Sequence, residues 1–431
     1  MTDPRRLLTR LDQAADGLAA DLVLYGVGAV FATVTASTST LLPHRAWGAI
    51  AAWAYLAAFV AAGLGLAVRH TAVSAARITA VSPARITAAR AWATAAAWAG
   101  STLLPLFVQA VQRADGRTDR AQEEVVVVEQ AGTRLLESGT PYLSRDAIAA
   151  LPPGEQLLGY LPYQPGMAVF GLPRAVAGDV WWTDARVAFA VGTAAALGAA
   201  VLVLHERRRP AVVRAVQFAT VLPICALTLA TGGDDLPVLA LCLLALACCA
   251  THRFGAAGLA VGGAAALKLF ALPVLIVLVV AAMTHGRGRR LVAGAVVLPV
   301  VTLLPAVAAA PGAVLENVVR FPLGHGLVTS PAQSPLPGYL ISANVPGGRY
   351  VAAALLVLAG AVIAVRLVRH PPRTAPAAAV FCGYGLLTAI LLMPTTRFGY
   401  LLYPLALLAW VPALRATADT PAAPAPIAVP R

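Results

Sequence analysis

Residues 255–284, GAAGLAVGGAAALKLFALPVLIVLVVAAMT, form an apolar run with one charged side chain, Lys268. A helix of about twenty apolar residues crosses the ~30 Å hydrocarbon core of a bilayer. Because this run is longer than one crossing and contains Lys268 and Pro273, we interpret it as a broken pair of helices that returns to the side where it began. Further apolar runs lie at residues 21–42, 47–68, 91–111, 184–204, 211–231, 236–250, 291–311, 350–367, 375–393 and 398–414. The predicted fold class is an all-α polytopic membrane protein with about 10–12 transmembrane helices.

Composition and charge agree with this class. Hydrophobic residues make up 59% of the chain, charged residues make up 12%, and the net charge is +13. Arginines concentrate in alternate loops between the apolar runs, which is typical of cytoplasmic loops. This bias predicts a multi-pass plasma-membrane protein whose N- and C-termini are cytoplasmic. Because the arginines are scattered over many short loops, they indicate contact with the lipid bilayer and no binding of nucleic acid.

The same pattern divides the chain into three regions. Residues 1–20 are expected to form an amphipathic cytoplasmic lead, because leucines recur there at helical spacing. Residues 21–414 form the transmembrane domain, with outer loops at 112–182 and 311–350. Residues 415–431, rich in proline and alanine, are expected to be a disordered cytoplasmic tail. The five cysteines lie in apolar runs without metal-ligand spacing, so we interpret them as small core residues.

The outer loop at residues 112–182 holds nine of the nineteen carboxylates of the chain. Glu123 to Ser138 has an unbroken helical pattern, and Gly139 with Pro141 just beyond is typical of a helix end. We therefore expect helices that lie along the outer membrane surface. Negative charge gathered beside apolar helices favours a membrane-embedded enzyme acting on a polar group of a lipid over a simple pore.

Glu123 and Glu124 stand at the start of this predicted helix. One interpretation is structural, because the helix dipole stabilises a carboxylate in the first turn. The other is catalytic, because a carboxylate at the membrane surface is a suitable general base for the hydroxyl of an incoming substrate.

Two cations stand out in the apolar part of the chain. Lys268 is the only lysine among 32 basic residues, and a lysine at mid-bilayer costs roughly 2.5–3.5 kcal/mol. It either snorkels to the interface or faces an anion such as phosphate. Arg397 lies in a short outer turn, against the charge bias, and either binds phosphate in bidentate fashion or contacts a lipid headgroup or a local ion partner.

Other polar residues of the predicted outer face are weaker candidates for substrate binding. Arg320 and His325 lie in the second outer loop. Asp234 and Asp235 precede an apolar run, so one is expected to cap the helix while the other binds a sugar hydroxyl or a cation. No P-loop, dinucleotide-binding glycine pattern or Ser/His/Asp set with recognisable spacing occurs. No cofactor and no metal ligands are predicted, and a requirement for a divalent metal stays open.

The stretch Glu123-Glu-Val-Val-Val-Val-Glu-Gln-Ala-Gly-Thr-Arg-Leu-Leu-Glu-Ser-Gly-Thr-Pro-Tyr142 resembles the first outer loop of glycosyltransferase family 87. These are membrane glycosyltransferases of the C-type superfamily, including polyprenol-phosphate-mannose-dependent α-1,2-mannosyltransferases. The family pattern runs from an acid through Gly, Leu-Leu and a Gly turn to Pro-Tyr, followed by Tyr-x-Pro, here Tyr160-Leu-Pro. The Gly-rich segment that ends in Lys268 is similar to a later family motif. The acid is Glu here where the family usually has Asp.

This resemblance, which covers roughly residues 91–410, implies a C-type glycosyltransferase fold and an active site at the outer face. It implies inverting transfer of a sugar, expected to be mannose, from a polyprenyl-phosphate donor to a glycolipid or glycan hydroxyl. Glu124 would be the base, because the family's acid lies eight residues before the glycine, here Gly132. Lys268 and Arg397 would hold the donor phosphate. Three tyrosines either line the sugar or lipid groove or anchor the chain at the interface: Tyr142, Tyr160 and Tyr163.

Two other classes of protein compete with this interpretation. A transporter or flippase of lipid-linked sugars would place the carboxylates and Lys268 along a translocation path, and a scaffold for envelope assembly would not need them. The long outer loop and the lack of half-to-half internal symmetry speak against a transporter.

Overall fold

The computed structural model describes residues 14–74, 82–204 and 210–418. Within these ranges the chain is helical, and the only β-type contact is an isolated parallel bridge between Gln333 and Thr396. The all-α prediction is therefore confirmed. Most of the predicted amphipathic lead and of the predicted tail, residues 1–13 and 419–431, lies outside the described residues.

Eight helices of the described residues are long and apolar enough to cross a membrane, and a ninth span results if α10 and α11, bent by 44°, count as one. Three shorter apolar helices, α12, α13 and α14, account for the larger number predicted. Two of these spans consist of several consecutive helices, namely α4 with η2 and α5, and η8 with α20 and α21.

The apolar helices are α2 (Leu18–Thr38, after the short turn η1 at Ala14–Gly17), α3 (Leu42–Ser74), α4 (Pro83–Trp98), η2 (Ala99–Leu103), α5 (Leu104–Ala114), α9 (Ala185–Val203), α10 (Pro210–Thr220), α11 (Pro223–Thr231), α12 (Asp235–Ala250), α13 (Phe254–Leu267), η6 (Leu269–Ala271), α14 (Leu272–Met283), α15 (Gly288–Ala309), α18 (Gly348–Arg369), α19 (Ala375–Leu392), η8 (Phe398–Leu401), α20 (Leu402–Ala409) and α21 (Val411–Ala418).

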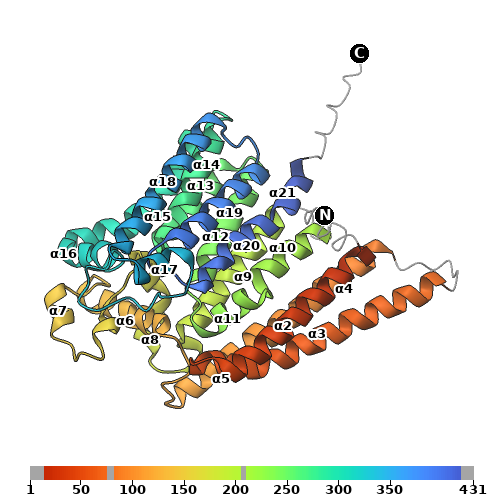
Figure 1. Cartoon of the computed structure of the whole chain (residues 1–431), viewed down its shortest axis with the longest axis horizontal. Coiled ribbons are helices and arrows are strands. Elements are labelled where there is room, and N and C mark those ends of the chain that lie inside the picture. Colours follow the sequence, from red (N-terminus) through yellow and green to blue (C-terminus); the bar gives the residue numbers. More distant parts are fainter. Residues whose placement is uncertain (1–13, 75–81, 205–209, 419–431) are drawn as a thin grey trace, which may run out of the picture.

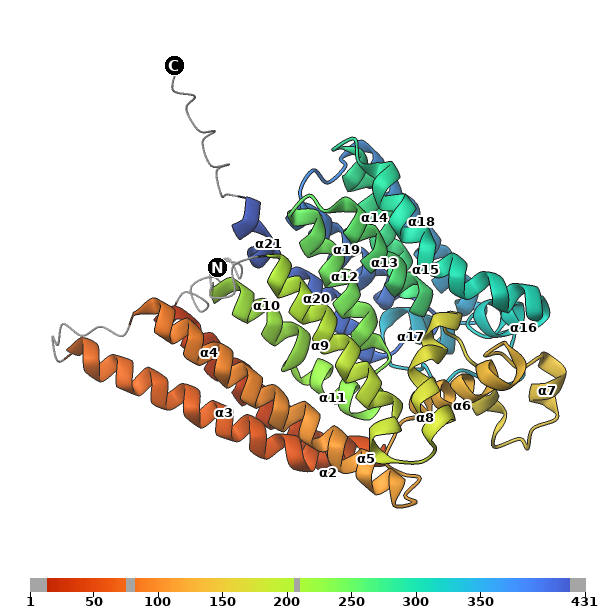
Figure 2. The ribbon, with the colours of Figure 1, turned by 180° about the vertical axis from the view of Figure 1, so that it is seen from behind.

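The long helices form two groups (Figure 1). Helices α2, α3 and α4 run side by side along one flank, and α9 to α15 with α18 to α20 form the main bundle. The helices of the predicted outer loops gather at one end of that bundle in both views (Figures 1 and 2). These helices are α6 (Glu123–Ser138), α7 (Arg145–Ala149), η3 (Gln156–Gly159), η4 (Pro165–Gly171), α8 (Leu172–Ala177), η5 (Trp181–Thr183), α16 (Pro311–Val314), η7 (Leu315–Arg320) and α17 (Pro337–Asn344).

The run at residues 255–284 is broken, as predicted. Helix α13 ends at Leu267, Lys268 has an extended backbone (φ −152°, ψ 140°), and α14 begins at Leu272. Helix α14 returns to the end from which α13 started, because the rings of His285 and Phe254 lie 5.5 Å apart. The break therefore places the lysine at the far end of both half-length helices.

Glycine contacts bring the backbones of neighbouring elements close together. A Cβ at Gly258 or Gly262 of α13 would collide with backbone carbonyls of α15, so these small residues allow the two helices to touch. In the same way, a Cβ at Gly132 of α6 would collide with the backbone of Gly171 in η4, and one at Gly166 would collide with Ala266 at the end of α13. Helix α6 thus packs on η4, and η4 packs on the end of α13 next to the break.

Candidate active site

A cavity of about 300 Å³ lies where the start of α6, the start of α12, the break after α13 and the loop before η8 meet. Its lining is both polar and aromatic. Eight of the eleven residues predicted from the sequence contribute to it: Glu123, Glu124, Tyr160, Tyr163, Asp234, Asp235, Lys268 and Arg397.

The start of α6 is joined directly to the loop that leads into α12. The backbone N–H of Gln122 donates to the carbonyl of Thr231 at 2.9 Å. Because Glu124 lies two residues after Gln122 and Asp234 lies three residues after Thr231, this hydrogen bond brings the two acidic pairs to one cavity. Glu123 is exposed, whereas Glu124 is partly buried.

Lys268 is buried between the two aspartates. Its Nζ lies 2.8 Å from Asp234 Oδ2 and 2.5 Å from Asp235 Oδ1, and Tyr403 donates to Asp235 Oδ1 at 2.8 Å. Lys268 is 6% exposed, so it does not snorkel to a surface. Asp234 occupies the N-cap position of α12 without capping the helix through its side chain, and the expected cap is therefore replaced by the ion pair.

Two aromatic rings enclose the same ammonium group. Lys268 Nζ lies 5.0 Å from the ring centroid of Tyr163 and 5.4 Å from that of Tyr400. A cation within about 6 Å of a ring face is stabilised by the ring quadrupole, and more so when it is desolvated. Lys268 is therefore held on several sides by protein groups. Its positive charge is shared by two carboxylates.

Arg397 forms an ion pair with Glu124 across the cavity. The side chain of Arg397 is 31% exposed and that of Glu124 is 11% exposed. The loop that carries Arg397 is held by backbone hydrogen bonds of its neighbour, Thr396, with Ala332 and Ser334, each of 2.9 Å. Arg397 is thus less buried than Lys268 and is paired with one carboxylate instead of two.

One wall of the cavity is an aromatic stack. The rings of Tyr160 and Phe321 lie 4.1 Å apart and are nearly parallel, and both line the cavity. The hydroxyl of Tyr160 donates to Glu316 Oε1 at 2.9 Å and accepts from Leu327 N–H at 2.8 Å. Burial, together with the neighbouring Glu316 carboxylate, raises the pKa of Tyr160, so the phenol stays protonated.

Three predicted residues lie outside the cavity lining. The hydroxyl of Tyr142 donates to the carbonyl of Tyr163 at 2.8 Å, so Tyr142 supports the wall from behind, and burial raises its pKa. The Arg320 side chain is half exposed and lies 3.6 Å from Glu316. The exposed His325 contributes a backbone carbonyl to Arg145.

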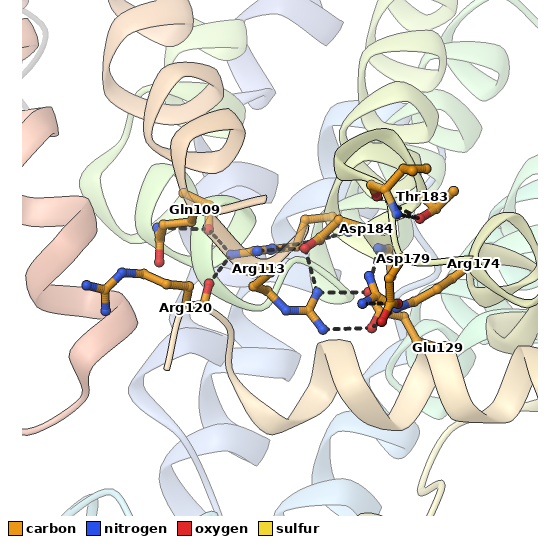
Figure 3. Close-up of polar contacts among 12 residues, drawn as sticks. Gln109, Arg113, Arg120, Glu129, Arg174, Asp179, Thr183 and Asp184 are labelled. Atoms are coloured by element: carbon orange, nitrogen blue, oxygen red, sulfur yellow. Dashed lines mark hydrogen bonds and ion pairs between the residues drawn. The ribbon is translucent and has the colours of Figure 1, made fainter. Parts of the chain in front are cut away.

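A buried network holds α6 in place behind the cavity (Figure 3). Arg113 of α5 bonds Glu129 of α6 at 2.8 Å and Asp184 at 2.5 Å. Asp184 also pairs with the fully buried Arg186 at 2.7 Å. Burial alone would raise the pKa of Asp184, but Arg186 and Arg113 outweigh it and hold that pKa well below its usual range. Glu129 in turn accepts from the N–H of Ala185 at the start of α9 at 3.1 Å.

Comparison with known proteins decides the family. Residues 160–394, more than half of the chain, match glycosyltransferase family 87. The chain belongs to glycosyltransferase family 87. Its family membership agrees with the resemblance noted in the sequence. No curated protein matches the chain.

Two solved structures are similar to this family 87 protein. One is ArnT from Cupriavidus metallidurans in the apo state, with 18% identity over 74% of this chain and 58% of the other, at a TM-score of 0.43. The second is the same protein bound to undecaprenyl phosphate, with 17% identity over 75% of this chain and 60% of the other, at a TM-score of 0.45. The chain spans about three fifths of the length of those chains.

The family 87 match includes some of the cavity and leaves out the rest. Tyr160, Asp234 and Lys268 lie inside residues 160–394, whereas Glu124 and Arg397 lie outside them. The evidence for the ion pair between Glu124 and Arg397 is therefore the structure, because the family match includes neither residue.

Sequence reasoning gave no site role to four residues that complete the cavity or support it. Tyr400 and Phe321 line it, Tyr403 holds Asp235, and Glu316 holds Tyr160. A signal for Glu316 was present, because it is one of only two carboxylates after Asp235 in the chain. Glu316 is 1% exposed. It is buried because of the backbone conformation of η7, which the composition of the chain does not indicate.

No metal site could be assigned in the part of the chain that the structure describes. No three His, Cys, Asp or Glu side chains are grouped there so that they could hold a metal ion. The four cavity carboxylates are divided between Lys268 and Arg397, apart from the exposed Glu123. No residue set can therefore be named for the divalent metal that the sequence left open.

Proposed function

We propose that this family 87 protein transfers a sugar, mannose, from a polyprenyl-phosphate donor to a hydroxyl of a glycolipid or glycan, at the cavity beside α6. The observation that carries the proposal is the ion pair between Glu124 and Arg397 on the cavity wall. It places a carboxylate suited to general-base catalysis beside a guanidinium suited to binding phosphate.

The reaction is a single displacement with inversion. The acceptor oxygen bonds to C1 of the donor sugar, and the bond between C1 and the phosphate oxygen breaks, with its electron pair going to the leaving polyprenyl phosphate. Glu124 accepts the proton of the acceptor hydroxyl. The phosphate gains one negative charge in this step, and Arg397 stabilises that charge as it develops.

Arg397 contacts Glu124 through Nη1, a nitrogen that bidentate binding of phosphate can also use. It pairs with Glu124, whose Oε1 faces the guanidinium. We propose that the donor phosphate draws Arg397 away and frees this oxygen for the acceptor hydroxyl. Donor binding would then precede activation of the acceptor, which protects the donor from transfer to water.

Lys268 has a different role from the one expected of a lone membrane cation. Because it is paired with Asp234 and Asp235, we propose that it fixes these carboxylates, which accept hydrogen bonds from hydroxyls of the donor sugar. Any direct contact of Lys268 with phosphate would be secondary to this pairing. The stacked rings of Tyr160 and Phe321 offer an apolar face against which a sugar ring can pack.

The cavity is proposed to open to the outside of the plasma membrane. The support is the arginine bias of the opposite loops, which is the pattern of cytoplasmic segments. A donor carried on a polyprenyl chain reaches such a cavity from the bilayer, next to α13 and α14.

The test is reconstitution of the purified chain in lipid with a polyprenyl-phosphate sugar and a mixture of envelope glycolipids as acceptors. The proposal predicts transfer of the sugar with stoichiometric release of polyprenyl phosphate. Mannose is tested against glucose and arabinose on the same carrier. Absence of transfer from all three donors, with binding of the donor also absent, would contradict the proposal.

A further inference from the structure

A second cavity, of about 490 Å³, lies at the other end of α12 and α13 from the catalytic cavity. Helix α12 has 16 residues between Asp235 and Ala250, and at 1.5 Å per residue the two cavities are about 24 Å apart along it. The lining residues are His252, Arg253, Phe254, Gly255, Ala256, His285, Arg287 and Arg290.

The charge of this second cavity has one sign. Three arginines and two histidines line it, and no carboxylate does. The chain contains no Asp or Glu between Asp235 and Glu316, so no acidic residue is close in sequence. Among the described residues, the side chains of Arg253, Arg287 and Arg290 form no ion pair. No carboxylate of the described residues therefore neutralises this positive charge.

The residues are arranged as a pocket and not only as a basic surface. The rings of His252 and His285 lie 5.4 Å apart, and Phe254, which is buried, contacts both. His285 Nε2 donates to the carbonyl of Arg373 at 2.9 Å, which fixes the ring. These aromatic groups and the three arginines line one cavity.

Two helices begin at this pocket. Arg253 precedes α13 and Arg287 precedes α15, and neither helix start is capped by a side chain. Their first N–H groups are hydrogen-bond donors at this cavity, whereas their dipoles are opposed by those of α12 and α14, which end there. The bias of arginine toward cytoplasmic loops explains the sign of this charge, but it does not explain why five basic side chains line one cavity.

We propose that this second cavity binds the phosphate of an anionic ligand, either a free phosphate or the headgroup of an anionic phospholipid. Guanidinium groups bind phosphate oxygens through paired, charge-assisted hydrogen bonds. The proposed ligand does not take part in glycosyl transfer, since the catalytic cavity lies at the opposite end of α12. The proposal does not depend on the proposed function.

The experiment compares two double variants of the full chain. In Arg287→Gln/Arg290→Gln, two cavity arginines are lost. In the control, Arg366→Gln/Arg369→Gln, two exposed arginines of α18 are lost, which do not line the cavity. All substituted side chains are exposed, so the fold is expected to survive, and Arg253→Gln provides a second test on α13 if one variant expresses poorly.

Binding of radiolabelled inorganic phosphate is measured by equilibrium dialysis of the detergent-purified protein. Retention of phosphatidylglycerol is measured by native mass spectrometry after exchange into phosphatidylcholine nanodiscs with and without that lipid. Loss of two charge-assisted contacts predicts affinity about ten- to hundredfold weaker in the cavity variant and unchanged in the control.

Each outcome decides the proposal. Phosphate binding at one site per chain that is lost only in the cavity variant supports a free phosphate as ligand. Retention of phosphatidylglycerol alone, lost only in the cavity variant, supports a lipid headgroup. Equal affinity of the two variants for the probes, whether retained or lost, or binding of neither probe by the unmodified protein, overturns the proposal.

Discussion

Glu124 and Arg397 are separated by more than 270 residues in the chain and form an ion pair on one wall of the candidate catalytic cavity. Glu124 reaches the cavity because the start of α6 is hydrogen-bonded to the end of α11, and Arg397 because its loop is bonded to residues 332–334. The pair joins the two groups that the proposed reaction needs, a proton acceptor and a binder of phosphate.

Replacement of Arg397 tests the phosphate contact. Arg397→Gln removes the guanidinium, and hydrogen bonds to a charged partner contribute about 1.5–3 kcal/mol, so the Kd of a polyprenyl-phosphate sugar should rise about ten- to hundredfold. Arg397→Lys should recover only part of the affinity because lysine lacks the bidentate fork. The control is Arg320→Gln, which lies outside the cavity and should leave the donor Kd unchanged. An unchanged Kd in Arg397→Gln would remove Arg397 from the donor site.

Replacement of Lys268 tests its pairing with the two aspartates. Lys268→Met should lower stability by about 3–5 kcal/mol, because it leaves buried carboxylates without a partner. The triple variant Lys268→Met/Asp234→Asn/Asp235→Asn removes all three charges and should recover most of the melting temperature in detergent. Sugar transfer should stay low in the triple variant if the aspartates bind the donor. A single variant as stable as the unmodified protein would show that the pairing is not needed for the fold.

The network behind α6 predicts a dependence of stability on pH. Because the folded-state pKa of Asp184 is held below its unfolded value, the network stabilises the fold above about pH 4 and loses this contribution as the pH falls. The melting temperature should therefore decrease between about pH 5 and pH 3. Asp184→Asn should lower the melting temperature already at pH 7, and its melting temperature should then change less as the pH falls. Asp179→Asn, which removes an exposed partner of Arg174, should change little. An equal decrease of the melting temperature at acid pH in the unmodified protein and in both variants would contradict the role assigned to Asp184.

Single cysteines test the orientation of the cavity. The native cysteines are all buried, so an impermeant maleimide should react with introduced ones. Gly154→Cys lies in the loop that carries α6 and is predicted to be labelled in intact cells, whereas Arg289→Cys, at the start of α15, is predicted to react only after permeabilisation. The reverse pattern would place the catalytic cavity on the cytoplasmic side.

The helices and the break at Lys268 could be predicted because they depend on local patterns. Apolar length determines the spans, and a lysine followed by Pro273 disfavours one continuous helix. The partner of Lys268 could not be predicted, because Asp234 and Asp235 lie more than thirty residues earlier and pair with it only through the packing of α12 against α13.

In the second predicted outer loop, residue type alone did not indicate which side chains face the site. Arg320 and His325 were candidates because they are basic residues of that loop, yet η7 buries Glu316 and Asn317 and leaves Arg320 exposed. Asn317 accepts from the N–H of Leu161 at 2.8 Å and thereby holds the Tyr160 wall. The direction of a side chain on such a loop depends on backbone geometry, which a lone charge in the sequence does not indicate.

The most direct test of the proposed mechanism is the rate of sugar transfer by Glu124→Gln and Glu123→Gln in the purified, lipid-reconstituted protein. The two neighbours point about 100° apart on a helix, so one of them can serve the reacting centre, and Glu124 is the partner of Arg397. Loss of a general base costs roughly 10²–10⁴-fold in rate. The account predicts such a loss for Glu124→Gln, with melting temperature and donor binding largely preserved, and near-normal transfer for Glu123→Gln. Transfer by Glu124→Gln at the rate of the unmodified protein would contradict it.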